Sequence, residues 1–228
     1  MTDTHTTAAA PSAAPATGAT GRARPGAEAT RARIVDAALH ALRDEGIAGI
    51  SARSIARHGG FNQALIFYHF GSVDGLLVAV AKSESERRSA LYAPALAEVT
   101  SLSGLVAVAR RLHDEEFRDG TVAALTQMLA GAVGSPDLSQ GIAESLRPWT
   151  DLVGRTIDRL LEGTPFGDVL SRDDLTSGIA ALFLGIELLT GIDPSLADGS
   201  LFTTMESVAT LIDGLIRAGL PTPGPTDA

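Results

Sequence analysis

The chain contains no cysteine, which excludes disulfide bonds and thiolate metal sites and is consistent with a reducing cytosol. Long hydrophobic runs are also absent: stretches such as Ile179–Ile186 fall far short of the roughly 20 apolar residues that cross a bilayer. The first residues, MTDTHTTAAAPSAAPATGATG, lack the basic segment and apolar run of a secretory signal. We therefore expect a cytoplasmic protein with no membrane partner.

An excess of positive charge is missing as well, since the net charge is -9. The charge is unevenly distributed, however. Residues 20–75 hold seven arginines and five acidic residues, a balance of +2, whereas residues 76–228 hold eleven basic and 21 acidic residues. This asymmetry predicts a mildly basic head on an acidic body, of which only the head need contact phosphates.

The two ends of the chain have little apolar material. Residues 1–26 are rich in Ala, Thr, Pro and Gly and cannot bury enough surface to offset their chain entropy, so we expect a disordered tail. Residues 221–228, PTPGPTDA, form a second one. Arg22 and Arg24 could belong to an arm that enters the minor groove, but a solvated tail is the favoured interpretation.

Helical periodicity begins after this tail. The residues that share one apolar helix face are Ile34, Ala37, Ala38, Ala41 and Leu42, and Gly46 should end that helix. A second, short helix is expected at Ser51–Arg57 with Ser51 as N-cap, stopped by Gly59 and Gly60. A third should span Asn62–His69, and Ser72 should begin a longer helix that Pro94 breaks.

The remainder of the sequence predicts helix after helix, with no sustained strand alternation. The expected ranges are 102–117, 121–133, 138–162 with a kink at Pro148, 173–190 and 200–218. The fold class is therefore all-α: an N-terminal three-helix helix-turn-helix domain at 27–74 and a larger helical-bundle domain for effector binding and dimerisation at 75–220.

Two short helices joined by a glycine-bearing turn are the units of a helix-turn-helix, which places its second helix in the major groove of DNA. The stretch 30–77, TRARIVDAALHALRDEGIAGISARSIARHGGFNQALIFYHFGSVDGLL, resembles the DNA-binding domain of the TetR (tetracycline-repressor) family. The most diagnostic feature is the cluster Phe67-Tyr68-His69-Phe70 followed by Ser72. The resemblance covers about a fifth of the chain.

The resemblance implies roles for residues of the head. The implied DNA-binding set is Ser51, Arg53, Asn62, Gln63, Ala64, Leu65, Tyr68, His69 and Ser72, and the implied core set is Ile55, Ile66 and Phe70. Asn or Gln can make bidentate bonds to adenine, and a leucine can contact a thymine methyl. Three positions depart from the commoner family pattern: Ala64, Leu65 and Val73, the last replacing a lysine that often contacts phosphate. Of Phe67, Tyr68 and Phe70, we expect two to be core.

For the body, the resemblance implies a homodimer and a small-molecule effector. The helices at 173–190 and 200–218 are candidates for a four-helix dimer interface, the alternative being an ordinary intrachain core. The candidate effector-binding residues are Phe117, Gln127, Met128, Trp149, Phe183 and Glu187. An unpaired buried carboxylate costs several kcal/mol, so Glu187 should be solvated or paired across the dimer rather than ligand-facing.

No cofactor or metal site is expected. His113 and the acidic residues after it could suggest metal ligands, but a di-iron bundle uses two Glu-x-x-His segments, and none exists here; EEFR is more simply a solvated helix face. No nucleophile elbow or phosphate loop occurs either, which leaves a helical enzyme as a remote alternative. The sequence indicates a one-component transcriptional regulator, most simply a repressor that binds a palindromic double-stranded operator and is released by an effector. An activator or a ligand-independent regulator would use the same head.

Overall fold

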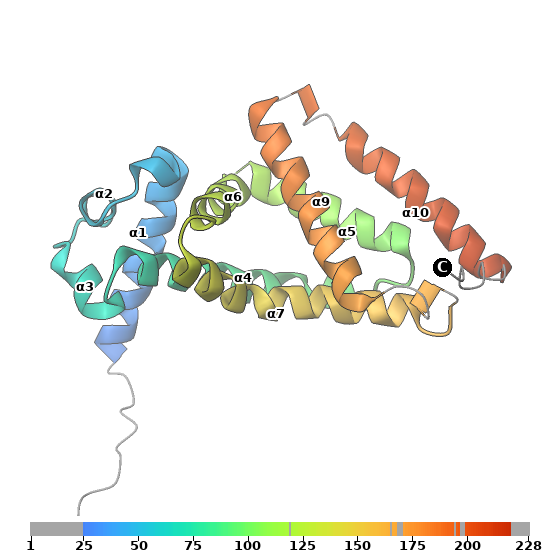
Figure 1. The fold of residues 1–228 in the computed structure, drawn as a ribbon, viewed down its shortest axis with the longest axis horizontal. Coiled ribbons are helices and arrows are strands. Elements are labelled where there is room, and N and C mark those ends of the chain that lie inside the picture. The colour runs from blue at the N-terminus through green and yellow to red at the C-terminus, as the bar shows by residue number, and fades with distance from the viewer. Residues whose placement is uncertain are drawn as a thin grey trace, which may run out of the picture.

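A computed structural model describes residues 25–118, 120–164, 166–167, 171–193, 195–196 and 199–219. Nearly all of the predicted tails, residues 1–24 and 220–228, lie outside these ranges. Within them the chain is built of α-helices, as the sequence predicted. Three helices form a head at one end, and two long helices, α4 and α7, run side by side from the head along the body (Figure 1).

The head contains α1 (Pro25–Gly49), α2 (Ala52–Gly59) and α3 (Ala64–Phe70). Gly46 leaves helical geometry at φ 66° and ψ 175°, but hydrogen bonding resumes for one further turn, so α1 ends three residues later than predicted. Ser51 begins α2 with a reciprocal cap: the Ser54 amide donates to Ser51 Oγ, and the Ser51 amide donates to Ser54 Oγ. Gly60 ends α2 in the left-handed region, at φ 62°, where a side chain would be strained.

The long connecting helix α4 (Val73–Ala97) starts as expected from Ser72, whose hydroxyl accepts a hydrogen bond from the Gly75 amide at 2.9 Å. The prediction that Pro94 breaks this helix is wrong, because α4 continues to Ala97 with Pro94 inside it. A proline removes one amide donor and crowds the preceding turn. Burial of Leu96 and Val99 in the body core supplies packing that favours the additional turn.

The body helices lie close to their predicted ranges. They are α5 (Leu102–Phe117), α6 (Thr121–Ala132), α7 (Pro136–Leu161), α9 (Arg172–Ile192) and α10 (Ser200–Ala218). The α7 helix passes through Pro148 and begins two residues earlier than expected, with Pro136 in its first turn, where the missing amide is not needed. Ser171 caps α9 by accepting from the Asp174 amide at 3.4 Å.

Two apolar clusters hold the described helices together. The first joins the head to the body: Ile34, Leu42, Ile55 and Ile66 pack with residues at the start of α4 and on α6 and α7. The second lies in the body, around Tyr92. Because the first cluster runs through the proposed boundary between residues 74 and 75, movement of α6 or α4 is mechanically linked to the head.

Helix α10 packs along α5 and is held there by polar contacts at both ends of the pair. The Asp213 carboxylate accepts hydrogen bonds from the amides of Leu102 and Ser103 at the start of α5, at 2.8 and 3.0 Å. These donors, together with the Ser103 hydroxyl, lower the pKa of Asp213 despite the opposing effect of its burial. At the other end of the pair, Arg110 donates to the Gly199 carbonyl at 3.1 Å and faces Glu206.

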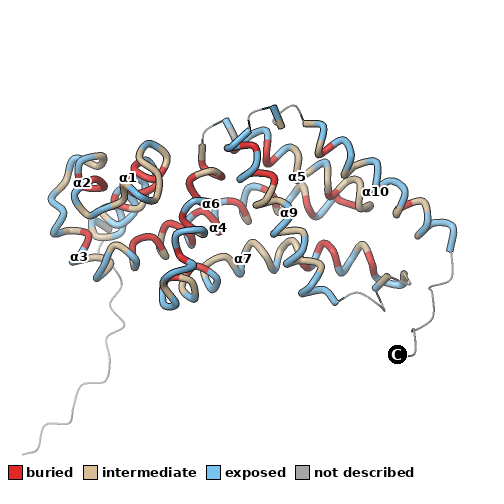
Figure 2. The backbone as a smooth tube through the Cα atoms, turned by 45° about the horizontal axis from the view of Figure 1, so that its top comes forward, coloured by how far each residue is buried: buried red, intermediate tan, exposed pale blue. Residues whose placement is uncertain are grey.

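Helix α9 is long and apolar enough, by length and composition alone, to cross a membrane, and is the one such single helix in the described part of the chain. The sequence analysis, which considered only uninterrupted apolar stretches, therefore underestimated the apolar length of this helix. Glu187 places a buried carboxylate, paired with His113, within this helix. Much of α9 and of α10 faces outward (Figure 2).

Candidate functional site

The helix-turn-helix presents the recognition helix α3 at one end of the molecule (Figure 1). Ile55 and Ile66 are fully buried and anchor α2 and α3 on α1. Asn62, Gln63, Ala64 and Tyr68 are exposed, as are Ser51, Arg53 and Ser72 in the same head. Most of the proposed DNA-binding residues are thus accessible to a partner, with Leu65 and His69 half-buried.

The exposed positions differ in what their side chains already bind. Asn62 Oδ1 accepts a hydrogen bond from the Ala64 amide at 2.9 Å, so bidentate pairing with adenine would compete with this turn. The Ser51 hydroxyl is likewise engaged in the cap of α2. Gln63 makes no side-chain cap to α3, which leaves its amide better placed to read a base. Leu65 packs partly against the head core rather than projecting fully outward.

The aromatic residues of α3 are less buried than predicted. Tyr68 is 81% exposed and Phe67 51% exposed, and only Phe70 packs against the head core. The prediction that two of these three rings are core is therefore wrong. An α-helix seven residues long has room for one buried face, which Ile66 and Phe70 occupy, four residues apart.

Arg31 of α1 supports the end of the recognition helix, a role that the sequence analysis missed. Its guanidinium donates to the His69 carbonyl and lies 4.4 Å from the centre of the Phe70 ring. Cations favour the C-terminal end of a helix and the face of an aromatic ring. An ion pair between Arg57 and Glu45 (2.6 Å) and a side-chain contact between His58 and Asp44 (3.2 Å) join α2 to α1. Contacts over such sequence separations leave no periodic signal.

The junction between head and body is polar at two points. Gln127 of α6 accepts a hydrogen bond from the Ile47 amide at 3.2 Å, directly after the break at Gly46. Arg43 of α1 donates to Thr121 at the start of α6. A Cβ at Gly46 would come within 2.7 Å of Gln127 Oε1, and the backbone φ of 66° would strain any other residue, so both features favour glycine here. Gln127 therefore faces the head and does not line the body cavity.

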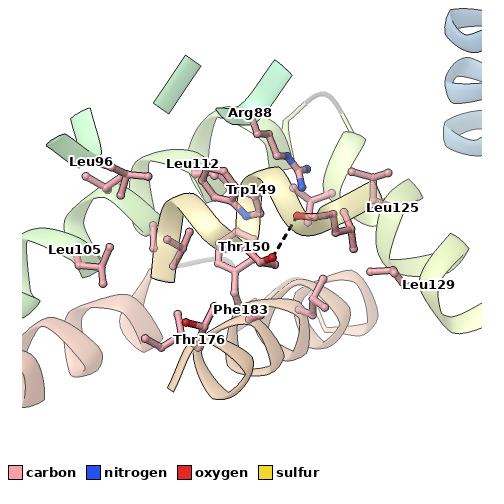
Figure 3. A pocket seen from close by; sticks show the side chains of 18 of the residues that line it. Arg88, Leu96, Leu105, Leu112, Leu125, Leu129, Trp149, Thr150, Thr176 and Phe183 are labelled. Carbon is pink, nitrogen blue, oxygen red and sulfur yellow. Dashed lines mark hydrogen bonds between the residues drawn. The ribbon is translucent and has the colours of Figure 1, made fainter. Parts of the chain in front are cut away.

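An apolar cavity of about 150 Å³ lies inside the body, among α4, α5, α6, α7 and α9 (Figure 3). Met128, Trp149 and Phe183 line it. The Trp149 ring stands edge-on to Tyr92, with 6.1 Å between ring centres. Of the other proposed effector-binding residues, Gln127 and Glu187 are not part of the lining, and the side chain of Phe117 lies outside the described part of the structure.

Glu187 is buried and binds His113, with 2.5 Å between Oε1 and Nδ1. The expectation of a solvated or dimer-paired carboxylate is thus wrong, because its partner comes from α5 of the same chain. Glu116 of the same helix is also buried, and it binds both Arg87 (2.6 Å) and Arg88 of α4. The stretch EEFR was predicted to be a solvated face, but α5 buries this residue to meet α4. No group of three or more potential metal ligands gathers in the described residues.

Burial raises the pKa of Glu187 above its usual value near 4.5, although the hydrogen bond and charge of His113 act in the opposite direction. A raised folded-state pKa means that the folded protein retains a proton which the unfolded chain has lost. This contribution to stability is fully present below about pH 4.5 and is lost as the pH rises through the folded-state pKa.

We therefore expect Glu187→Gln to gain stability relative to the native chain as the pH rises from 5 to 8, because the amide does not titrate. Urea unfolding at several pH values measures the difference in free energy of unfolding. The exposed Glu144 provides the control, since Glu144→Gln should give a difference that varies much less with pH. A constant difference for Glu187→Gln would contradict the raised pKa.

The fold and the exposed helix α3 have the architecture of a helix-turn-helix transcriptional regulator. Residues 34–80 match the family described as "Bacterial regulatory proteins, tetR family". The HTH-type transcriptional repressor Rv1474c of Mycobacterium tuberculosis is 27% identical over 83% of this chain and 94% of its own length. The repressor AcnR of Corynebacterium diphtheriae is 25% identical over 84% and 93% of the two chains.

Solved structures give the same fold. The multidrug binding protein EbrR complexed with imidazole superposes with a TM-score of 0.58 at 23% identity, over 86% of this chain and 98% of that one. The head of the chain thus matches the TetR family of bacterial regulatory proteins, most of the chain is similar to two transcriptional repressors, and the solved structure shares its fold. Members of this family are regulators of transcription, and the alternative of a helical enzyme is thereby set aside.

Proposed function

We propose that the chain is a cytoplasmic repressor that binds a palindromic operator as a homodimer and is released by a small apolar effector. The observation that carries this proposal is a single continuous helix, α4, which begins at the recognition helix and contributes Arg88 and Leu96 to the interior cavity. The full-length similarity to two proteins named as repressors supports repression over activation.

In the proposed complex, Gln63 reads base edges while Arg53, Tyr68, His69 and Ser72 contact the backbone. Polar side chains in the major groove distinguish base pairs, whereas phosphate contacts fix register without reading sequence. The exposure of Gln63 and Tyr68 supports this division. Leu65 is assigned a smaller role, a contact with a thymine methyl by its exposed part.

The proposed dimer interface is formed by α9 and α10. Large apolar side chains are exposed on both helices: Leu182, Leu189, Ile192, Val208, Leu211 and Leu215. Gly178 and Gly185 add space on α9, because a Cβ at either would meet nothing in the subunit. Exposed apolar surface on this scale marks an interface, and a second copy of the same two helices would complete a four-helix bundle.

The effector is proposed to act through α4 and α6 together. Val122, Leu125 and Met128 of α6 line the cavity, while Thr121 and Gln127 of the same helix hold α1. A ligand that displaces α6 would therefore move the head at Gly46, and displacement of α4 would move α3. Either changes the spacing of the two recognition helices. A tenfold loss of operator affinity requires about 1.4 kcal/mol of coupling and weakens effector binding to the DNA complex equally.

Selection of bound DNA from a random pool tests the dimeric repressor. A twofold dimer places recognition helices in successive major grooves, so we expect inverted half-sites separated by about one helical turn or slightly more. Footprinting of the selected sequences measures the spacing. Selected sites without dyad symmetry would contradict the proposed dimer.

A further inference from the structure

The cavity holds one charged side chain, that of Arg88, among the residues that line it. Its other hydrogen-bonding side chains are two threonines and Trp149, whose indole N–H is a donor. The Thr150 hydroxyl already donates to the carbonyls of Leu146 and Arg147 at 3.4 and 3.2 Å. Thr176 Oγ1 is buried and has no hydrogen-bond partner in the described structure. A ligand in this cavity would therefore meet apolar walls, the unpartnered Thr176 hydroxyl, the indole of Trp149 and one guanidinium.

Arg88 reaches from α4 toward Trp149 and Thr150 (Figure 3). Glu116 engages one edge of its guanidinium, accepting from Nε at 2.8 Å and pairing with Nη2. The buried nitrogen Nη2 lies against Glu116 without forming a hydrogen bond of good geometry, and Nη1 makes no hydrogen bond within the described ranges. A guanidinium has five N–H donors in a planar fork. Arg88 thus keeps donor capacity beside the cavity after binding Glu116.

An anionic oxygen pair suits this donor group better than a neutral ligand does. Carboxylates form bidentate, charge-assisted hydrogen bonds with arginine, and such bonds strengthen where water is excluded. A purely apolar ligand would cover the guanidinium without offering it an acceptor, which carries a desolvation cost. Glu116 also pairs with Arg87 at 2.6 Å, and Arg87 binds Glu84 at 2.9 Å. Arg88 can therefore bind a ligand carboxylate while Glu116 remains paired with Arg87.

The size of the cavity limits the ligand. A cavity of about 150 Å³ lined by apolar side chains is large enough for benzene, and the cavity here has this volume. We propose that the effector is a compact apolar carboxylate, an aromatic or branched monoacid whose carboxylate binds Arg88 and whose hydrocarbon part packs on Trp149 and Phe183. This inference rests on the proposed function, in which the cavity is the effector site.

The position of Arg88 connects ligand chemistry to regulation. Arg88 belongs to α4, whose first turn follows the recognition helix. A ligand carboxylate that binds Arg88 would weaken the ion pair between Arg88 and Glu116 of α5. This ion pair is one of the contacts that hold α4 against α5. The charged group of the effector thereby acts on the helix that carries the head, while its apolar part acts on α6.

The test compares acids with neutral molecules of similar shape, using the full chain without DNA. Benzoate and cyclohexanecarboxylate are titrated beside benzamide and cyclohexanecarboxamide, with calorimetry and the fluorescence of Trp149, the one tryptophan in the chain, as readouts. We expect each acid to bind at least tenfold more tightly than its amide, a difference of about 1.4 kcal/mol. Equal affinity for acid and amide, or no binding by either acid, overturns the proposal.

Substitutions of Arg88 test whether this residue causes the preference for acids over amides. Arg88→Met should abolish the acid preference, and Arg88→Lys, which keeps the charge but loses the fork, should retain part of it and serves if the methionine variant does not fold. Arg155→Met is the control, because Arg155 is exposed on α7 and does not line the cavity; it should bind like the native chain. An undiminished acid preference in folded Arg88→Met or Arg88→Lys overturns the assignment.

Titration of the same compounds into the operator complex separates this inference from the proposed function. An acid that binds through Arg88 but leaves the operator bound supports the ligand class and contradicts release by an effector. Amides that bind the cavity and release the operator as well as the acids do support release and overturn the carboxylate preference.

Discussion

Leu211→Asp is expected to leave the subunit folded, to abolish dimerisation and to reduce operator affinity at least 100-fold. Leu211 is 70% exposed on α10, so in the isolated subunit an aspartate would be solvated and should change the free energy of unfolding by about 0.5 kcal/mol or less. In the proposed dimer the same carboxylate would be buried at a cost of several kcal/mol. Twofold symmetry introduces this cost twice.

The effect on DNA follows from the number of half-sites that one particle can hold. A dimer engages two half-sites at once, and the second binds at the high effective concentration set by the first. A monomer has only one recognition helix and loses this advantage. Sedimentation or light scattering measures the association state, and titration of a labelled operator measures the affinity.

Val133→Asp provides the matched control. Val133 is also apolar and is 84% exposed, but it follows α6 rather than lying on α9 or α10. This variant should remain dimeric and bind the operator like the native chain. A dimeric Leu211→Asp protein that retains full operator affinity would contradict α10 as the interface.

The head could be predicted from the sequence because its determinants are local. Caps at Ser51 and Ser72 and the turn at Gly60 act within a few residues, and the apolar face of α1 repeats with the helical period. The prediction was less accurate where distant packing decides. Pro94 remains inside α4 because the body core packs beyond it, and Phe67 is exposed because α3 has only one face toward the core.

The cavity could be predicted only in part. Met128 and Trp149, predicted as effector-binding residues, lie on its walls, since large apolar side chains gather in the interior of a bundle; their binding of an effector stays a prediction. Gln127 precedes Met128 by one residue, and a helix turns by about 100° per residue, so this amide meets α1 instead. The choice between these two faces depends on where α1 packs, which periodicity does not reveal.

Buried charge was the hardest feature to predict. Arg88 lies in a charged stretch, KSESERRS, which resembles a solvated helix face, but α4 turns this arginine inward to Glu116, 28 residues away. Glu187 is similarly satisfied by His113, 74 residues before it. Charged side chains are rarely buried unless they are paired, and pairing over such distances is a property of the tertiary fold. The charged side chain beside the cavity therefore became evident only in the three-dimensional structure.

Base reading is expected to depend most on Gln63. Its side chain is exposed directly before α3 and makes no cap to that helix, whereas the Asn62 side chain is engaged in the preceding turn. A bidentate amide–adenine contact contributes about 1–3 kcal/mol of discrimination. Because a dimer presents two recognition helices, Gln63→Ala should cost about 2–6 kcal/mol on a full palindrome, if the two half-sites contribute independently.

The loss caused by Gln63→Ala should also depend on sequence, and this distinguishes base reading from backbone contact. Affinities of the native chain and the variant are measured on the selected operator and on versions substituted one base pair at a time. For Gln63→Ala, symmetric substitutions at one position of each half-site should cease to matter, while other positions keep their effect. Tyr68→Phe is the matched comparison, because it removes only a hydroxyl proposed to contact phosphate and should weaken all these sequences by a similar factor. A uniform loss for Gln63→Ala would show that Gln63 contacts the backbone and that other residues of α3 read the bases.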